Sequence, residues 1–321
     1  MRVHIIVDYS FLYYKYKFSL DKGHMKRIIV LDDSTGVNVE RDISQIYYSL
    51  REIESFRRKL EHVGHDVTMT VCFDMPSVRK EKEEEAEKNG DIKKANGYKS
   101  NRGNKLTEKD FKDIREVQSM LDKAGYNTFR LEGFEADDIV TTLVSKYKDD
   151  FDYTVIYTPD KDLLINISDK VGVYRYKWTT GYFGVDRKNY ETYLEEEFKT
   201  RIPYNALGLY LSSVGDKADV IKGIHKFGNA AWSKMLDWLD SKGVDWSKCG
   251  DYNELEKVVA LTKDYLKPEQ FDELSFAFSM VANIDAFDIE IDSKGTTGRG
   301  HSTRQSREEA YGKWELRSLY D

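Results

Sequence analysis

Three short apolar runs in the first half of the chain predict buried strands. They lie at 3–7 (VHIIV), 67–73 (VTMTVCF) and 154–158 (TVIYT). Apolar residues at helical spacing occupy 43–63 and 107–124, between the strands. Strands that alternate with helices predict an α/β domain with a mainly parallel sheet and crossover helices. The carboxyl ends of such strands form a ligand crevice, and these three runs end at or just before Asp8, Asp74 and Asp160.

The rest of the chain contains two regions with a different pattern of polar and apolar residues. Residues 79–105 are almost entirely polar and predict a solvated helix, a mobile loop or both. The pattern from 204 to 239 predicts short helices joined by glycine-bearing turns, and 252–283 predicts further helix. We therefore expect three regions: an α/β domain at 1–200, a helical region at 201–290, and a partly flexible tail with a short terminal helix at 291–321.

Composition narrows the class of protein. No apolar run approaches the roughly 20 residues that cross a bilayer, and the N-terminal segment is too short for a signal peptide, so we expect a cytoplasmic protein without membrane contact. Cys72 and Cys249 are too few and too far apart to suggest a disulfide framework or a zinc site. The net charge of −7 argues globally against nucleic-acid binding. Fifty basic residues can still form a basic face beside an acidic pocket.

Acidic residues recur where the predicted strands end and where helices begin. Any single member is explained by capping or turn formation, but their joint occurrence is not. Carboxylates crowded into one crevice repel one another unless divalent cations neutralise them, and all-oxygen ligands favour Mg²⁺, Mn²⁺ or Ca²⁺. Two such ions about 4 Å apart would suit phosphoryl transfer. The set is Asp8, Asp74, Glu135, Asp137, Asp138, Asp160, Asp162, Asp216 and Asp219.

Six motifs appear in the order found in a known family. They are VDYS (7–10), CFD (72–74), GYKSNR (97–102), EGFEADDIV (132–140), TPDKDLL (158–164) and GDKADVIKGI (215–224). From residue 3 to about 231 the chain resembles the flap endonuclease or 5′-nuclease superfamily, and its layout is most similar to standalone phage 5′-to-3′ exonucleases. The resemblance implies a PIN-like α/β fold, two Mg²⁺ ions for which Mn²⁺ can substitute, and cleavage of DNA at 5′ flaps and 5′ ends.

The resemblance also assigns the carboxylates to two metal sites. Asp8, Asp74, Glu135 and Asp137 resemble the ligands of a first ion, whereas Asp160, Asp162, Asp216 and Asp219 resemble a second, weaker site. Asp138 matches a position that bridges toward both sites. Helical spacing adds that Glu135 and Asp138 project to a similar side, while Asp137 is rotated by about 100° from each neighbour.

The polar segment corresponds, by resemblance, to a helical arch through which a single-stranded 5′ end passes. Lys99 and Arg102 would point at the scissile phosphate, and Tyr98 would stack on a terminal base. From the residues alone, a solvated basic turn is the alternative. The acidic run at 81–87 would face outward, with four basic residues facing inward: Arg79, Lys80, Lys93 and Lys94.

Residues 219–231 resemble the turn of a helix-three-turn-helix, an element that grips duplex DNA through its backbone. Gly223 and Gly228 match this motif. Lys226 replaces its middle glycine, and Ala230 stands where a lysine is usual. The bulky Lys226 argues against the K⁺ ion that the resemblance implies at this turn, and its ammonium would supply the phosphate contact that Ala230 cannot make.

The leading hypothesis is therefore a monomeric, structure-specific nuclease that trims 5′-ended or branched DNA and removes RNA primers during replication. Its setting would be the bacterial host's cytoplasm if the protein is phage-encoded. A polymerase, a sliding clamp and a single-strand-binding protein are the partners to consider. Two alternatives are a branched-DNA binder without catalysis and a PIN-type ribonuclease that acts on single-stranded RNA.

Overall fold

The computed structural model describes residues 1–32, 39–89, 97, 106–177, 179, 181–250, 252–281, 302–314 and 316–319. Within them lie a six-stranded sheet in the order β5-β4-β1-β6-β7-β8 and a separate two-stranded sheet, β2-β3. The strands are β1 (Arg2–Asp8), β2 (Ile29–Asp32), β3 (Val39–Asp42), β4 (Asp66–Cys72), β5 (Asn127–Phe129), β6 (Tyr153–Tyr157), β7 (Val171–Lys177) and β8 (Gly181–Val185).

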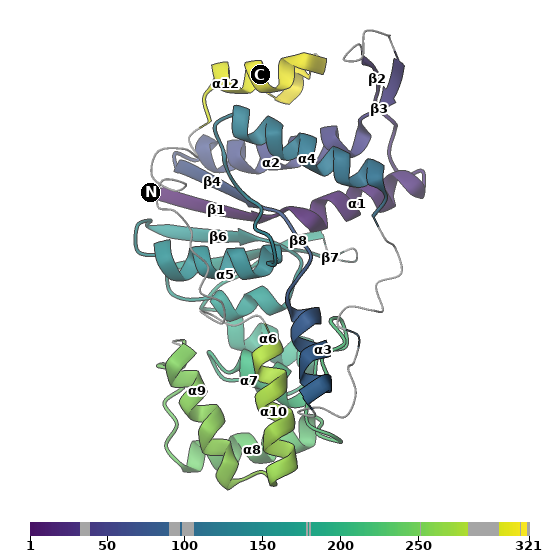
Figure 1. Cartoon of the computed structure of the whole chain (residues 1–321). Helices are drawn as coiled ribbons and strands as arrows, with labels where there is room; N and C mark the ends of the chain where they lie inside the picture. The colour runs from purple at the N-terminus through teal and green to yellow at the C-terminus, as the bar shows by residue number, and fades with distance from the viewer. Residues whose placement is uncertain are drawn as a thin grey trace.

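Helices surround the large sheet and build a second region beyond it (Figure 1). The α-helices are α1 (Tyr9–Asp21), α2 (Ser44–His62), α3 (Arg79–Asn89), α4 (Glu108–Lys123), α5 (Ala136–Tyr147), α6 (Tyr190–Phe198), α7 (Leu207–Val214), α8 (Asn229–Ser241), α9 (Tyr252–Leu261), α10 (Pro268–Met280) and α12 (Arg304–Tyr311). The 3₁₀ helices are η1 (Asp162–Asn166), η2 (Thr262–Asp264), η3 (Gly312–Trp314) and η4 (Arg317–Leu319). None of the helices in the described ranges is long and apolar enough to cross a membrane.

The sheet is mainly parallel, which confirms the prediction from the apolar runs. Strands β4, β1, β6 and β7 run in parallel, and only β8, at one edge, is antiparallel to its neighbour. In register, Asp8 pairs with Cys72, and Val7 pairs with Tyr157. Asp8 ends β1, and Asp74 and Asp160 follow the adjacent strands β4 and β6, so all three lie at the carboxyl ends of neighbouring strands, as predicted.

Alternating side chains of the central strand pack into two separate cores. Val3, Ile5 and Val7 of β1 face a core that is completed by α1, α2, α4 and α12. Ile6 faces the other core, which contains α5, β7 and the helices α6 to α10. Figure 1 shows α2 and α4 on one side of the sheet and α5 on the other.

The C-terminal helix α12 packs on the first domain, far from its neighbours in sequence. The hydroxyl groups of Tyr311 and Tyr126 each donate a hydrogen bond of 2.8 Å to Glu54 Oε1. Tyr311 and Glu54 are both fully buried. The sequence predicted a short helix in the tail, but it did not predict that the helix docks through a buried carboxylate. The domain limits at 200 and 290 stay predictions.

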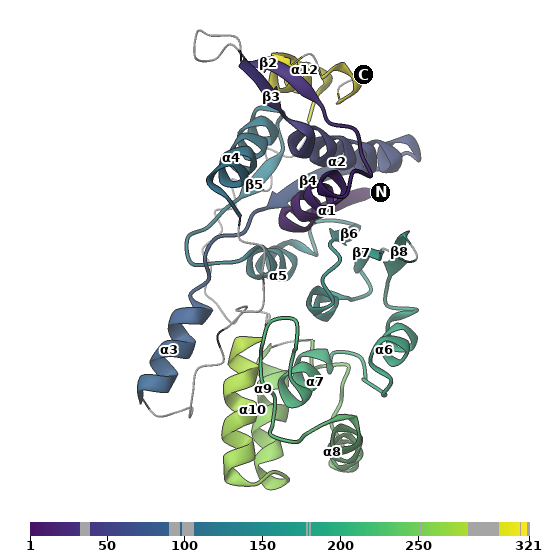
Figure 2. The same ribbon diagram turned by 90° about the vertical axis from the view of Figure 1, so that its right-hand side faces the viewer.

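Helix α3 lies on the far side of the molecule from α12 and extends along the helical region (Figures 1 and 2). It begins next to the end of α10, since Lys82 Nζ donates to the carbonyl oxygen of Ser279 at 3.3 Å. Its sequence is polar on all sides, so it lacks the apolar stripe of an ordinary surface helix. A solvated helix was one of the predicted states; residues 90–96 and 98–105 of the predicted arch lie outside the described residues.

Candidate metal centre

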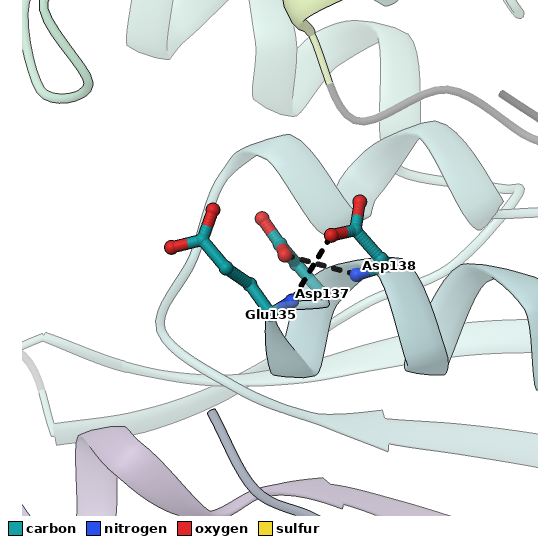
Figure 3. Close-up of side chains that lie close together, drawn as sticks. All are labelled: Glu135, Asp137 and Asp138. Carbon is teal, nitrogen blue, oxygen red and sulfur yellow. Dashed lines mark hydrogen bonds between the residues drawn. The ribbon is translucent and has the colours of Figure 1, made fainter. Parts of the chain in front are cut away.

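Three carboxylates gather where α5 begins. Glu135, Asp137 and Asp138 each offer an oxygen within 4.8 Å of the others (Figure 3). Glu135 is the N-cap, and its main-chain nitrogen donates to Asp138 Oδ2 at 3.1 Å. The nitrogen of Asp138 donates to Asp137 Oδ1 at 2.9 Å. Helical spacing does not describe Glu135, because its backbone is extended (φ −85°, ψ 164°), and the three carboxylates reach one common volume.

Hydrogen bonds hold the strand-end aspartates in place: Asp74 at the start of α5, and Asp8 at the end of β6. Asp74 Oδ1 accepts a bond of 2.7 Å from the nitrogen of Ala136, the first residue of α5. Asp8 Oδ2 accepts a bond of 3.0 Å from Thr158 Oγ1, and the same hydroxyl oxygen accepts from the nitrogen of Asp160 at 3.0 Å. Thr158, which is fully buried, thus ties the ends of β1 and β6 together.

The remaining aspartates form a second group beside the first. The nitrogen of Asp162 donates to Asp160 Oδ1 at 2.9 Å. Lys161 Nζ bridges Asp162 Oδ1 at 2.8 Å and Asp216 Oδ2 at 2.5 Å. Asp219, also buried, is close enough to Asp160 to raise its pKa, although burial of Asp160 is the larger cause. The structure therefore brings all nine predicted carboxylates into one acidic region with two groups.

The acidic region carries more negative charge than its own cations neutralise. Burial, followed by repulsion from Asp74 and Asp160, raises the pKa of Asp8 well above its usual value. Burial and the neighbouring Asp137 raise the pKa of Asp138 to about 7. Burial and Asp160 likewise raise the pKa of Asp162. Burial and mutual repulsion thus both disfavour the ionised state of these carboxylates, and a bound cation would offset both.

The donor set fits a hard divalent cation. The gathered ligands are carboxylate oxygens, the type that Mg²⁺, Mn²⁺ and Ca²⁺ prefer. The nearest thiol is unsuited to metal binding, because burial, Asp8 and Asp74 raise the pKa of Cys72 and keep it protonated. In the described residues, the acidic region is therefore a candidate site for divalent ions and not for zinc held by thiolates.

Two basic side chains, Arg79 and Lys161, contact these carboxylates in a way that the sequence does not predict. Arg79 Nη1 donates to Glu135 Oε2 at 3.0 Å and to Asp138 Oδ2 at 2.8 Å, and its Nη2 donates to Asp138 Oδ1. We had expected Arg79 to line the inner face of the arch. Lys161 bridges the second group, and it lowers the pKa of Asp216 although burial alone would raise it. Arg79 and Glu135 are 56 residues apart, so no local pattern indicates this contact.

The other predicted residues fall in two segments, one between Asp74 and Glu135 and one after Asp219. Lys99, Arg102 and Tyr98 lie outside the described residues, so their roles stay predictions. Gly97 precedes them, and its nitrogen donates to Glu83 Oε2 at 3.0 Å, which places that point of the chain beside α3.

Gly223, Lys226 and Gly228 lie in the loop that joins α7 to α8. A methyl group at Gly223 would lie 2.3 Å from the carbonyl oxygen of Ser213, so this position requires glycine. Lys226 has a φ of 57°, a left-handed conformation that favours glycine, and this fits its place where the resembling motif has one. Gly228 is the N-cap of α8, and a methyl group there would meet nothing within 4 Å. Whether the loop acts as a helix-three-turn-helix stays a prediction.

Comparisons with known proteins agree with this geometry. Residues 4–202 match the family described as 5′-3′ exonuclease, N-terminal resolvase-like domain. A 5′-3′ exonuclease from Aquifex aeolicus is 32% identical over 114 residues, which are 35% of this chain and 36% of that protein. A DNA polymerase I from Treponema pallidum is 30% identical over 143 residues, 43% of this chain and 13% of the polymerase. These matches thus span about a third of the Aquifex protein and about an eighth of the Treponema polymerase.

The fold is also found among solved structures. The crystal structure of a bacteriophage T5 flap endonuclease, in a pseudo-enzyme-product complex with DNA and metal ions, has a TM-score of 0.54 at 16% identity. The comparison covers 98% of this chain and all of that one. The family match extends over residues 4–202, well over half of the 321 residues. This chain therefore belongs to the 5′-3′ exonuclease family defined by that N-terminal resolvase-like domain.

Proposed function

We propose that this protein is a Mg²⁺-dependent 5′-nuclease that cuts 5′ flaps and shortens duplex 5′ ends. One observation carries the proposal: carboxylates from three strand ends and the start of α5 meet at one edge of a mainly parallel sheet. Membership in the 5′-3′ exonuclease family supports the direction of cleavage. The T5 relative with the same fold was solved with both DNA and metal ions, which supports the class of substrate.

The ions would be held by the two carboxylate groups. Asp8, Asp74, Glu135 and Asp137 would hold the first ion, with Asp138 turned toward the second. Asp160, Asp162, Asp216 and Asp219 would hold the second. When bound, divalent ions activate the attacking water and stabilise the leaving oxygen of a phosphodiester. The chain's own part is to fix the ligands: Thr158 orients Asp8, and the nitrogen of Ala136 orients Asp74.

Basic residues of the chain would position the substrate. Lys99 and Arg102 would stabilise the developing charge on the scissile phosphate, and Tyr98 would stack on a terminal base. The loop between α7 and α8, with Gly223, Lys226 and Gly228, would contact the duplex backbone, and Lys226 would supply a phosphate contact without a K⁺ ion. Lys99→Ala should then slow cleavage far more than it weakens DNA binding. Equal losses in both would make Lys99 a phosphate anchor.

The biological role that fits this activity is trimming of 5′ ends and RNA primers during DNA replication. Its substrates would be branched DNA and RNA-primed DNA, and the protein would act as a monomer. A polymerase is a fitting partner, because a DNA polymerase I is among the relatives. A sliding clamp and a single-strand-binding protein are further candidates.

Cleavage mapping separates this proposal from two alternatives. Purified protein should be given 5′-flap, nicked and blunt DNA and single-stranded RNA, each with Mg²⁺, with Mn²⁺ or with EDTA. We expect cuts near the junction of flap DNA that depend on the divalent ion and disappear in Asp137→Asn. Flap binding without cleavage would instead favour a branched-DNA binder. Cleavage of RNA with intact flaps would favour a PIN-type ribonuclease.

A further inference from the structure

Arg79 joins three parts of the molecule at the metal centre. It is the first residue of α3, and its guanidinium forks onto both oxygens of Asp138 while also contacting Glu135, so it reaches two acidic residues at the start of α5. Its Nε donates to the carbonyl oxygen of Met280, the last residue of α10, at 3.1 Å. The side chain is only 1% exposed. A single buried cation therefore connects α3, α5 and α10.

The same oxygens cannot serve Arg79 and a metal ion fully at once. A guanidinium that forks onto a carboxylate uses the lone pairs of both oxygens in its own plane. Both carboxylate oxygens of Asp138 accept hydrogen bonds from Arg79, and so does one of the two oxygens of Glu135. A divalent ion that enters the group of Glu135, Asp137 and Asp138 adds a second cation next to the first. Repulsion between two cations among these largely buried carboxylates then favours one cation over the other.

We propose that Arg79 is a built-in counter-ion of the metal centre, that a divalent ion displaces it from Glu135 and Asp138, and that this exchange releases the first turn of α3. The inference rests on the proposed function in one respect: these carboxylates must bind the ion. It goes further in linking occupancy of the metal centre to the position of α3.

The contacts of α3 show why displacement of Arg79 from the carboxylates would loosen this helix. The nitrogen of Arg79 bonds Ser77 Oγ, and the preceding residue, Val78, donates to the carbonyl oxygen of Gly133, just before the acidic cluster. Lys82, one turn further on, contacts the end of α10 by a solvent-exposed bond of 3.3 Å to the carbonyl oxygen of Ser279. Loss of the Arg79 contacts would remove the buried, charged contact between α3 and α10 and weaken their association. Ion entry would thus free α3, the helix that precedes Lys99 and Arg102 in the sequence.

Metal binding without DNA tests the exchange directly. Mn²⁺ is titrated into the full-length protein by calorimetry, for wild type, Arg79→Gln and Arg57→Gln. The control is matched: Arg57 is also buried and bonds a buried carboxylate, Glu54, but lies in the other core. We expect Arg79→Gln to bind Mn²⁺ on the order of tenfold more tightly than wild type, because its competitor is gone. Arg57→Gln should bind as wild type does.

Amide hydrogen exchange of residues 82–89 provides the second readout. Mn²⁺ should accelerate exchange there in wild type, whereas in Arg79→Gln exchange should be fast with or without the ion.

Unchanged or weaker Mn²⁺ binding in Arg79→Gln would overturn the inference, because Arg79 would then hold the carboxylates in place for the ion. If Arg79→Gln does not fold, Arg79→Lys replaces it: an ammonium cannot fork, so tighter binding is expected, and unchanged binding overturns the inference. Wild type that binds no Mn²⁺ or Mg²⁺ would instead refute the proposed function.

Discussion

The main-chain nitrogen of Ala136 donates a hydrogen bond of 2.7 Å to Asp74 Oδ1. The bond joins Asp74, two residues after the end of β4, to the first turn of α5, across 62 positions of sequence. It satisfies one of the amide groups that a helix leaves unpaired at its start. One carboxylate therefore orients the helix that carries Glu135, Asp137 and Asp138, and it is itself a predicted metal ligand.

Substitution of Asp74 should separate its two roles. Asp74→Asn keeps an oxygen that accepts the Ala136 bond and removes a charge that repels Asp8, so without metal it should be at least as stable as wild type. Asp74→Ala loses the cap and should be about 1 kcal/mol less stable than Asp74→Asn. The free energy of unfolding is measured by urea titration in EDTA. A less stable Asp74→Asn would show that the charge, and not the bond, fixes α5.

The stabilisation that Mg²⁺ provides, relative to protein without divalent ions, should show that Asp74 is also a metal ligand. Mg²⁺ at about 100 times its dissociation constant should raise the free energy of unfolding of wild type by roughly 2.7 kcal/mol. Asp74→Asn should gain clearly less from the same Mg²⁺ concentration. An equal gain in both proteins would exclude Asp74 from the metal centre.

His4 should make the stability fall in mild acid. It is buried in β1, lies 2.8 Å from Thr70 Oγ1 and stacks on Phe151, and burial lowers its pKa to about 3. Because the unfolded chain binds the proton near pH 6.5 and the folded chain does not, stability from this group is complete above about pH 6.5. It is lost by about 1.4 kcal/mol per pH unit as the pH falls toward 3.

Carboxylates titrate over the same pH range, so the comparison with His4→Gln isolates the histidine. The free energy of unfolding of wild type minus that of His4→Gln should shrink as the pH is lowered from 7 to 5. A difference that stays constant over this range would mean that His4 binds its proton equally well in the folded and the unfolded chain, against the lowered pKa.

Tyr311→Phe should loosen the docking of α12. The substitution removes a 2.8 Å hydrogen bond to a fully buried carboxylate, so we expect a loss of about 1.5–3 kcal/mol in the free energy of unfolding. Tyr47→Phe is the control: it removes an exposed bond of 3.1 Å to Ser318 in the same C-terminal segment. That change should stay within about 0.5 kcal/mol. Similar losses in both variants would contradict a special role for Glu54.

The loop between α7 and α8 should tolerate a methyl group at one glycine only. In Gly223→Ala the new carbon would lie 2.3 Å from the oxygen of Ser213 and 2.4 Å from the nitrogen of Gly215, which should cost about 1–3 kcal/mol of stability and weaken duplex binding. Gly228→Ala meets nothing within 4 Å and should be nearly neutral for stability. Thermal unfolding and fluorescence anisotropy with duplex DNA measure the two effects.

The strand-end aspartates could be predicted because both the strands and their parallel order leave a local pattern. Apolar runs mark β1, β4 and β6, and an aspartate ends or closely follows each of them. Strands β5 and β8 carry no such signal, because β5 has three residues and β8 alternates exposed and half-buried positions around Gly184. The hairpin of β2 and β3 is largely exposed, so burial imposes no pattern there.

Contacts made by charged side chains over long sequence distances could not be predicted. Arg79 bonds Glu135 and Asp138 because β4 and α5 bring their ends together, and Lys161 meets Asp216 across 55 residues. Glu54 receives Tyr311 from 257 residues away. Each contact depends on the assembled fold, and the residues on either side of these charges look like ordinary solvated helix or turn.

Cleavage of a 5′-labelled flap DNA tests the central claim most directly. Wild-type protein with Mg²⁺ should release a labelled fragment cut near the junction of single strand and duplex. EDTA, or the single change Asp137→Asn, should abolish that product while flap binding persists. An uncut flap with both Mg²⁺ and Mn²⁺, from folded protein that binds the DNA, would contradict a metal-dependent 5′-nuclease.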